Sequence, residues 1–394
     1  MAKNIAVGID IGTYQIKIVV AEKIRDGGNT SFKIIGTGFA ESKGLRHGYI
    51  INSSDTIRSL GIAIAEAEKT SNIKIRKAFL SIGGIGVGSV ISQGSMIIPR
   101  ADSEITDLDV KNVLAIAESE IPANISINRK IIHTIPLSYK IDGKTVLGRP
   151  IGMKGIKFEA KVLFITCLEH HLNDLINTVE ESGIEVLNIM ASPLAGSMVV
   201  LNKTQKIAGC VLANIGSETV SIVVFENNLP ISLEVFPIGG TDITNDIALG
   251  LKIPLDEAEN IKINSEQDFN YPKKRLEEII LARLSDIFDL IEAHLKKLGR
   301  SGLLPAGIIL TGGTSGVSTI EDLAKATLKL PSKIGSINFT TSLKNCQIKD
   351  SSWSVAYGLC LWGLGNNDDI SLGVQNSQIR RGIWLFSWFK QFLP

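Results

Sequence analysis

The chain has 394 residues, of which 44% are hydrophobic and 37 are glycine, and its formal net charge is +1. That length supports two or three packed units with substantial cores, and the balanced charge gives no reason to expect nucleic acid as a partner. The four cysteines lack metal-binding spacing and are expected to be reduced thiols. The N-terminus has no apolar signal core, so we do not expect secretion, and no run of about 18 apolar residues could span a membrane.

The first predicted element is a β-hairpin over residues 5–22. Isoleucine and valine alternate along both strands, and Gly12-Thr13 marks the turn between them. This turn would gather backbone N–H groups, the Thr13 hydroxyl and the Asp10 carboxylate at one tip. Such a tip suits a phosphate group and the magnesium ion that accompanies it. On its own, however, a hairpin of this kind is more often purely structural.

The rest of the first half alternates strands and helices around a stretch of different texture. We expect strands over 32–40 and 77–82, the latter ending in Gly83-Gly84, and between them a helix that Ser54-Asp55 caps and that runs to about residue 70. Residues 85–165 predict an inserted α+β subdomain, with strands over 87–98, 131–141 and 160–166, a helix over 110–120 that Thr106 caps, and a glycine-rich loop over 143–155. Residues 166–195 then resume the α/β pattern, with a helix over 170–182, a strand over 186–189 and a second helix opening at Ser192-Pro193.

Residues 210–226 repeat the opening hairpin. Aligned without a gap on residues 6–22, they are identical at seven positions, including the turn glycine (Gly12 and Gly216), and Asp10 falls on Asn214. A second pair of matching segments supports the repeat, because residues 78–84 and 308–313 are both apolar strands that end in Gly-Gly. Two copies in the same order predict a duplicated α/β domain.

The second half is otherwise rich in expected helices. They cover residues 241–251, 255–262, 272–298, 317–330 and 352–363. Residues 364–379 are small, polar and without periodicity, which indicates a linker. The last stretch, 380–394, is abruptly aromatic.

Two hairpins that face each other could hold one polyphosphate from both sides, and glycines at 312–313 would let a base or ribose approach the backbone. This pattern resembles the superfamily of actin, the heat-shock chaperone ATPases and the sugar kinases. Five stretches narrow the resemblance to FtsA, the actin-like bacterial cell-division family: residues 147–156, 161–167, 238–248, 258–262 and 309–313. The resemblance covers nearly the whole chain, including the insert.

The resemblance implies a fold of duplicated actin-like (ribonuclease H-like) α/β domains around a nucleotide cleft, with an inserted α+β subdomain. We expect a first domain (1–84 with 166–195), the insert (85–165), a second domain (196–240 with 303–363), a helical subdomain (241–302), a linker (364–379) and a terminal helix (380–394). Helix 352–363 is the one element that could return to the first domain.

The resemblance also implies ATP and Mg²⁺ as cofactors. Gly12 and Thr13 would contact the β- and γ-phosphates, and Asp10 would lie near the magnesium. Glu259 and Lys262 share one helix face and would contact ribose and adenine, although an ordinary helix ion pair is the alternative. The residues implied to bind the nucleotide are Asp10, Gly12, Thr13, Tyr14, Gln15, Lys17, Asn214, Gly216, Ser217, Glu218, Thr219, Gly239, Gly240, Glu259, Lys262, Gly312, Gly313 and Thr314.

The second hairpin departs from the family pattern. The family typically has Asp-Ile-Gly-Gly-Gly-Thr-Thr-Asp, whereas residues 214–221 read Asn-Ile-Gly-Ser-Glu-Thr-Val-Ser. Both acids are therefore absent, and a Glu218 carboxylate aimed at a triphosphate would be repelled. Since general-base help to an attacking water is then doubtful, we expect ATP binding with weak or absent hydrolysis, in a protein that is not an enzyme.

The C-terminal stretch predicts a helix that lies in a membrane surface. On a helical wheel, the aromatic and leucine side chains of residues 383–393 fill one wide arc, and nothing acidic follows Asp369. A helix docked on its own domain or on a protein partner is the alternative. The residues expected to contact an anionic membrane are Arg380, Arg381, Trp384, Leu385, Trp388, Phe389, Lys390 and Phe392.

The expected partners also follow from the resemblance. The family's region around helix 272–298 binds the tail peptide of FtsZ, the tubulin-like ring protein, and Arg283 is the residue we expect to take part. Self-association into an actin-like polymer and binding of later division proteins to residues 85–165 are further expectations. The site of action would be the cytoplasmic face of the inner membrane at the division septum. Two alternatives remain within the superfamily: a small-molecule kinase, for which the second hairpin offers no clear acid, and a pilus-assembly protein.

Overall fold

The computed structural model describes residues 4–26, 29–263, 271–317, 319–341, 343, 348 and 350–366. The strands are β1 (Ile5–Ile11), β2 (Gln15–Asp26), β3 (Asn29–Glu41), β4 (Leu45–Arg46), β5 (Tyr49–Ile50), β6 (Lys77–Ile82), β7 (Val87–Ile97), β8 (Arg129–Ile141), β9 (Lys144–Val146), β10 (Lys157–Leu168), β11 (Glu185–Ala191), β12 (Cys210–Ile215), β13 (Val220–Glu226), β14 (Leu229–Phe236), β15 (Ile308–Thr311), β16 (Ser332–Ile334) and β17 (Thr340–Thr341). The helices are α1 (Ser53–Ser71), α2 (Asp107–Ser119), α3 (Ala123–Ser126), α4 (Glu169–Glu181), α5 (Ser192–Val200), α6 (Lys203–Ala208), α7 (Gly240–Leu251), α8 (Leu255–Ile263), α9 (Lys273–Lys297), α10 (Ile320–Leu328) and α11 (Ser354–Asn366), with short 3₁₀ helices η1 (Gly313–Gly316) and η2 (Ser351–Trp353).

Two sheets with the same strand order form the body of the molecule. The first runs β3-β2-β1-β6-β11 with β17 added at the β3 edge, and the second runs β14-β13-β12-β15-β16. In each sheet a hairpin pairs in parallel with the strand that precedes the Gly-Gly turn: Gly8 lies opposite Phe79 in the first, and Leu212 lies opposite Ile309 in the second. The sequence repeat therefore corresponds to a structural duplication, as predicted.

The turn glycines of the two hairpins are required by the turns themselves. The Gly12 amide donates to the Gln15 carbonyl at 3.1 Å, and the Gly216 amide donates to the Thr219 carbonyl at 2.9 Å. A Cβ atom at either glycine would stand 2.9 or 3.0 Å from that same carbonyl oxygen. Because a side chain there would push the turn apart, glycine is retained in both copies while the neighbouring residues differ.

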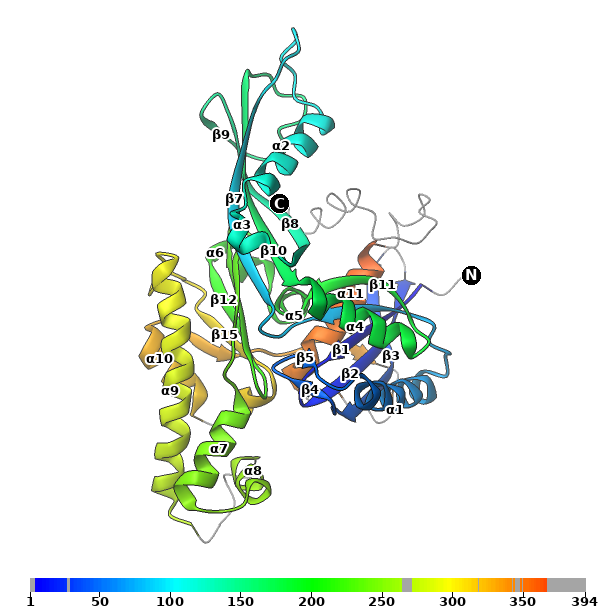
Figure 1. The fold of residues 1–394 in the computed structure, drawn as a ribbon, viewed down its shortest axis with the longest axis vertical. Helices are drawn as coiled ribbons and strands as arrows, with labels where there is room; N and C mark the ends of the chain where they lie inside the picture. The colour runs from blue at the N-terminus through cyan, green and yellow to red at the C-terminus, as the bar shows by residue number, and fades with distance from the viewer. Residues whose placement is uncertain are drawn as a thin grey trace.

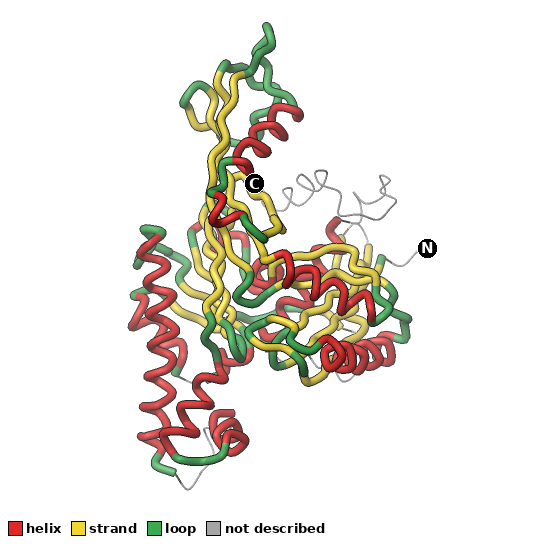
Figure 2. The backbone as a smooth tube through the Cα atoms, viewed as in Figure 1, coloured by secondary structure: helices red, strands yellow, loops and turns green. Residues whose placement is uncertain are grey.

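The inserted subdomain is built on a separate four-stranded sheet, β7-β10-β8-β9, with α2 packed on β7 and β10. It projects from the body along the long axis of the molecule, at the opposite end from α7 and α8 (Figures 1 and 2). Where the insert joins the body, Arg129 donates hydrogen bonds to the Thr166 hydroxyl at 2.9 Å and to the Gly86 carbonyl at 2.7 Å. Ser89 and Leu233 exchange two hydrogen bonds of 2.8 Å, which join the insert to the second sheet.

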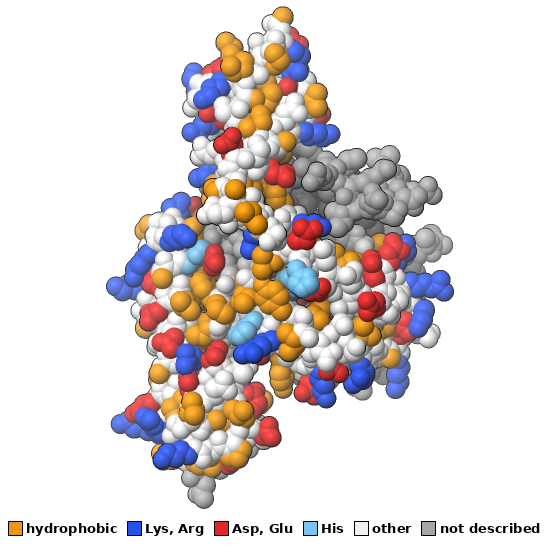
Figure 3. Space-filling model, in the orientation of Figure 1, with side chains coloured by type: hydrophobic (Ala, Val, Ile, Leu, Met, Phe, Trp, Pro, Cys, Tyr) orange, Lys and Arg blue, Asp and Glu red, His pale blue; other side chains and the backbone are white. Residues whose placement is uncertain are grey.

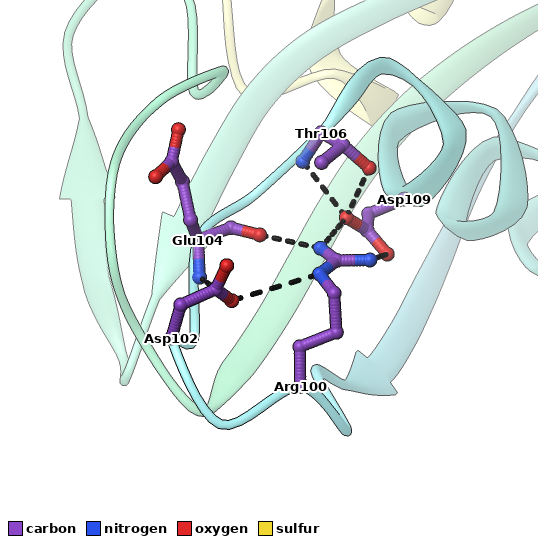
Figure 4. Close-up of polar contacts among 5 residues, drawn as sticks. All are labelled: Arg100, Asp102, Glu104, Thr106 and Asp109. Atoms are coloured by element: carbon purple, nitrogen blue, oxygen red, sulfur yellow. Dashed lines mark hydrogen bonds and ion pairs between the residues drawn. The ribbon is translucent and has the colours of Figure 1, made fainter.

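A polar network closes the start of α2 in the insert. The backbone N–H and hydroxyl of Thr106 both donate to the Asp109 carboxylate, at 2.8 and 2.6 Å, and Arg100 bridges that carboxylate to the Glu104 carbonyl and the Asp102 carboxylate (Figure 4). The predicted Thr106 cap is confirmed. Burial on its own would raise the pKa of Asp109, but the hydrogen bonds from Arg100 and Thr106 outweigh it and hold the pKa at about 2.

Three local expectations are corrected by the structure. Helix α1 is capped by Asn52, whose side chain accepts from the Asp55 amide, so the cap lies before the Ser54-Asp55 pair. The predicted helix over 317–330 starts later, because η1 occupies the residues after the Gly-Gly turn and α10 begins at Ile320. The glycine-rich loop over 143–155 contains the short strand β9, which pairs with β8.

Helix α11 lies on the first sheet although it comes last in the described chain. It packs against β1, β2 and α5. The approach is so close that a Cβ atom at Gly8 would stand 2.1 Å from the Ala356 carbonyl oxygen. Cys360, in the middle of the helix, is fully buried and donates from its thiol to the Val19 carbonyl at 3.1 Å. Three described cysteines (Cys167, Cys210 and Cys360) are free buried thiols, and Cys346 lies outside the described residues.

Candidate nucleotide site

Asp10 is the next-to-last residue of β1, close to the turn of the first hairpin. Its carboxylate accepts a hydrogen bond of 2.6 Å from the Ser81 hydroxyl, because β1 and β6 pair in parallel with a register that brings the two residues side by side. Desolvation raises the pKa of Asp10, while the Ser81 hydrogen bond and the charge of Lys17 act in the opposite direction. A desolvated carboxylate of this kind gains from a cation. Ser81 was not identified from the sequence, although its place two residues before Gly83 was a usable signal.

Lys17 lies opposite Asp10 in the hairpin and points toward η2. Its ammonium donates to the Ser352 carbonyl at 3.1 Å and to the Ser352 hydroxyl at 2.8 Å, and it lies 5.7 Å from the centre of the Trp353 ring. Desolvation lowers the pKa of Lys17, opposed by the charges of Asp10 and Asp350. The first hairpin is thus connected through Lys17 to the start of α11, and Ser352 is a neighbour that sequence reasoning missed.

The second hairpin holds the matching residues of the second domain. Its Asn214 lies against Gly312, where a Cβ atom would stand 2.4 Å from the Asn214 side-chain oxygen. Gly312 has a φ of 94°, a conformation that favours glycine. By contrast, a Cβ atom at Gly313 would meet nothing within 4 Å. The space beside the Gly313 backbone is therefore open, and its contact with adenosine stays a prediction.

Three segments meet at the Gly216 carbonyl. The Gly240 amide donates to it at 2.9 Å and the Thr314 hydroxyl at 3.0 Å, and the Thr241 amide donates to the neighbouring Ser217 carbonyl at 2.7 Å. Gly239 is closely enclosed, since a Cβ atom there would stand 2.5 Å from the Ser217 carbonyl oxygen. The second hairpin, the start of α7 and η1 therefore form one connected group, which joins the sequence-predicted residues 214–217, 239–240 and 312–314.

Glu259 and Lys262 make the helix ion pair that was the alternative reading, with 2.7 Å between charged atoms. The pair also belongs to the group around Gly216: the Lys262 ammonium donates to the Gly240 carbonyl at 3.1 Å and to the Thr244 hydroxyl at 2.8 Å. Thr244 donates in turn to the Glu259 carboxylate. The ion pair and a place beside the predicted site are compatible, and Thr244 is a further neighbour that sequence reasoning missed.

Glu218 does not stand free at its turn. Its carboxylate accepts a hydrogen bond from the His47 backbone amide, and its carbonyl lies 3.1 Å from His47 Nδ1. The remaining turn residues are placed at the hairpin tips: Thr13, Gln15 and Thr219 are partly exposed, and the Tyr14 side chain is 54% exposed.

The described residues contain no group of three or more histidine, cysteine, aspartate or glutamate side chains that could hold a metal ion. A magnesium ion that travels with ATP needs only one or two protein carboxylates, because phosphate oxygens and water complete its octahedron. The desolvated Asp10 fits that limited role, while Asn214, at the matching position of the second hairpin, brings no charge.

Comparison with known proteins identifies the family. The chain is 31% identical to the cell division protein FtsA of Pseudomonas aeruginosa, over an alignment that covers 94% of this chain and 92% of that protein. It belongs to the FtsA family of cell division proteins. FtsA of Borreliella burgdorferi is 30% identical over 99% of the chain and 100% of that protein, and FtsA of Bacillus subtilis is 28% identical over 91% and 83%. The expected family is therefore confirmed.

Family models and solved structures agree with this assignment. The model for cell division protein FtsA matches residues 211–358, and the model for the SHS2 domain inserted in FtsA matches residues 84–166. The PilM–PilN type IV pilus biogenesis complex superposes with a TM-score of 0.67 at 17% identity, covering 91% of this chain and 98% of that chain. MreB5 of Spiroplasma citri, in a structure bound to ADP, superposes with a TM-score of 0.54 at 13% identity, covering 94% and 99%. The duplicated actin-like fold with an inserted FtsA subdomain is confirmed.

The residues predicted to meet other partners lie on α9 or outside the described chain. Arg283 on α9 forms two hydrogen bonds with Asp246 on α7, of 2.7 and 3.0 Å, and an ion pair of 3.3 Å with Asp286. The aromatic segment 380–394 lies outside the described residues. Within the part of the chain that is described, no helix is long and apolar enough to cross a membrane.

Proposed function

We propose that this FtsA-family protein binds ATP with Mg²⁺ between its two actin-like domains, assembles into an actin-like polymer and attaches the FtsZ ring to the cytoplasmic face of the inner membrane at the septum. The proposal that the protein binds a nucleotide rests on the matched pair of glycine turns at Gly12 and Gly216. The first turn lies beside Asp10, and the second is hydrogen-bonded to Gly240 at the start of α7. MreB5 of Spiroplasma citri, a neighbour in fold, is described as bound to ADP and to AMPPNP, which supports a nucleotide at this position.

We propose further that hydrolysis is weak or absent. Asn214 and Ser221 stand where the family's second hairpin usually has acids, and the one remaining acid of this turn, Glu218, accepts from the His47 amide. A general base must lie within hydrogen-bond reach of the attacking water, and the second hairpin offers no uncommitted carboxylate for that purpose. Phosphate release by purified protein at a rate that Asp10→Ala abolishes would contradict this proposal.

The FtsZ tail peptide is proposed to bind near Arg283. The Arg283 guanidinium forms an ion pair with Asp246 of α7. Leu249, three residues after Asp246 on α7, has 78% of its surface exposed. A cation beside an exposed leucine suits a peptide that carries both acidic and apolar side chains.

The insert is proposed to bind later division proteins or another copy of the chain. Its side chains around β9 include several exposed apolar residues, and Leu147 has 96% of its surface exposed. Apolar side chains are visible on the surface of the insert in Figure 3. Large exposed apolar patches on a protein surface mark interaction sites. The residues concerned are Leu147, Ile151, Met153 and Ile156.

Co-sedimentation tests the proposed function as a whole. The full chain should carry purified FtsZ down with anionic phospholipid vesicles, and a chain ending at residue 379 should leave both proteins in the supernatant. Comparison with and without ATP shows whether the nucleotide promotes assembly on the vesicles. Recovery of FtsZ with vesicles in the absence of residues 380–394 would contradict the proposed anchor.

A further inference from the structure

A pair of hydrogen bonds joins the turn between β4 and β5 in the first domain to the turn of the second hairpin. His47 and Glu218 are 171 residues apart, and they meet twice: the His47 amide donates to the Glu218 carboxylate, and His47 Nδ1 lies 3.1 Å from the Glu218 carbonyl oxygen. Since a carbonyl oxygen only accepts, Nδ1 carries the hydrogen in this contact. The side chain and the backbone of Glu218 are therefore both held by one residue of the first domain.

The His47 side of this contact is fixed firmly to the first domain. The Ile85 amide donates to the His47 carbonyl at 3.3 Å. Gly48 lies so close to Gly84 that a Cβ atom on Gly48 would stand 2.4 Å from the Gly84 Cα atom. The next residue, Tyr49, packs its ring on His171 with 4.5 Å between centroids. His47 itself adopts a φ of 48°, which few side chains favour and which the surrounding contacts must maintain.

The Glu218 side is fixed equally firmly to the second domain. Its turn closes through the Gly216–Thr219 hydrogen bond, and the turn carbonyls accept from Gly240, Thr241 and Thr314. The chain passes from the first sheet to the second between α5 and β12, and it returns between β16 and β17. A rotation that moved the β4–β5 turn away from the second hairpin would break both His47–Glu218 hydrogen bonds.

We propose that His47 and Glu218 form a latch that keeps the two actin-like domains closed and thereby slows the release of bound nucleotide. The proposal rests on the proposed function, because it assigns a regulatory role to the same site. It also accounts for the unusual turn: glycine at position 218, which the family pattern usually has, lacks the carboxylate that receives the His47 amide. The latch is thus a property of this sequence, added by a side chain where the second hairpin has lost its acids.

Amide hydrogen exchange tests the latch without any nucleotide. In the full chain, Glu218→Ala removes the acceptor of the His47 amide, so exchange at His47 should accelerate at least about tenfold, as expected for an amide that loses its hydrogen-bond partner. Glu218→Gln keeps an oxygen acceptor and should leave the exchange rate within about twofold of the original. Glu180→Ala, on the exposed face of α4, is the matched control and should leave it unchanged. An unchanged His47 rate in Glu218→Ala would overturn the proposal.

Release of a fluorescent ATP analogue measures the consequence. With Mg²⁺ present, Glu218→Ala should release the analogue about tenfold faster than the original chain, which corresponds to about 1.4 kcal/mol, and Glu218→Gln should restore slow release. His47→Asn removes the imidazole contact with the Glu218 carbonyl, and asparagine tolerates the positive φ at this position. This variant should accelerate release of the analogue by a smaller factor. Equal release rates in the original chain and in Glu218→Ala would refute the latch. Failure of the original chain to bind the analogue would refute the proposed ATP site, and the exchange experiment would still decide the latch.

Discussion

Asp10 and Asn214 occupy the same place in the two halves, and comparing them shows how the duplicated site has diverged. Each is the next-to-last residue of the first strand of its hairpin. Each lies next to a hydroxyl residue of the parallel neighbouring strand, Ser81 in one half and Thr311 in the other. Ser81 donates to Asp10, whereas the Thr311 hydroxyl donates to the Ser351 carbonyl. The geometry is conserved within the molecule, but a negative charge remains on one side only.

Removing the Asp10 charge should raise the stability of the folded protein and weaken the binding of ATP with Mg²⁺. Desolvation raises the pKa of this carboxyl, so its ionised form destabilises the folded state at neutral pH. We expect Asp10→Asn to raise the melting temperature of the protein without nucleotide, and to weaken binding of ATP with Mg²⁺ at least about tenfold. Calorimetric titration and thermal unfolding measure the two effects. Unchanged affinity for ATP in the presence of Mg²⁺ would remove Asp10 from the metal site.

His133 should make stability depend on pH in the acidic range. It is a buried residue of β8 beside the end of β11, where its Nε2 accepts from the Ala191 amide at 3.1 Å, and desolvation lowers its pKa to about 3. At a pH below 6.5, the usual pKa of histidine, the His133 imidazole takes up a proton in the unfolded state but stays neutral in the folded state. The free energy of unfolding should therefore fall as the pH drops below 6.5, by about 2 kcal/mol from this residue at pH 5. Urea unfolding of His133→Gln at pH 7.5 and 5.0 should show a smaller fall than the original chain shows.

The sequence anticipated residues whose role depends on the backbone better than those whose role depends on side-chain neighbours. Gly12, Gly216 and Gly312 were predicted from local patterns, because a turn or a positive φ leaves a signature in the sequence. Ser81, Ser352 and Thr244 were missed, because strand register and long-range packing bring them to the site. The latch could not be predicted at all, since its partners are 171 residues apart.

At the scale of elements, the boundaries of strands and helices were predicted well only where no local hydrogen bonds competed with them. The boundaries of β6 and the amphipathic helix α9 were predicted closely, since periodicity and flanking signals agreed there. The start of α10 was not, because the residues after the Gly-Gly turn satisfy their carbonyls within η1 first, with the Ser315 amide and the Val317 amide donating to Gly312 and Thr314. Competing local hydrogen bonds of this kind leave little trace in hydrophobic periodicity.

The cap of α2 should contribute measurably to the stability of the insert. Asp109→Asn removes the charge that Arg100 and Thr106 bind, and should lower the free energy of unfolding by about 1–2 kcal/mol. Asp107→Asn, exposed in the same first turn, is the control and should cost no more than about 0.5 kcal/mol. Because the pKa of Asp109 is held at about 2, its contribution is complete above pH 3.8 and is lost as the pH falls through 2. Equal losses in the two variants would contradict this role.

The Arg283–Asp246 pair between α9 and α7 allows the peptide site to be separated from the fold. If Arg283 binds the FtsZ tail peptide directly, Asp246→Asn should keep or raise the peptide affinity, because it removes one of the two carboxylates that pair with the guanidinium. Arg283→Ala should then lower the affinity at least about fivefold. Fluorescence anisotropy with a labelled peptide measures both. Equal weakening by the two variants, together with lower melting temperatures, would show that the pair only supports the helices.

At the scale of the whole molecule, two contacts connect both domains to the start of α11. Lys17 links the first hairpin to η2, and α11 extends from η2 across the first sheet to Asn366, where the described chain stops. The Thr311 hydroxyl, from the second sheet, donates to the Ser351 carbonyl of the same short helix at 2.8 Å. The junction before α11 therefore receives hydrogen bonds from both domains, and a rotation between them would act on the helix that precedes residues 367–394.

The aromatic and basic residues of 380–394 should contribute to membrane binding in different ways. Replacing Trp384 and Trp388 by glutamate should abolish binding to phospholipid vesicles at any salt concentration, because it removes the apolar face that enters the headgroup region. Replacing Arg380 and Arg381 by alanine should instead weaken binding only to anionic vesicles, by about fivefold for each cation lost at low salt, and the difference should disappear at about 1 M salt, where the screening length is about 3 Å. Vesicle sedimentation with neutral and anionic lipids separates these effects. If the tryptophan variant still binds, the segment is held at the surface by charge alone, and the amphipathic helix proposed for it is wrong.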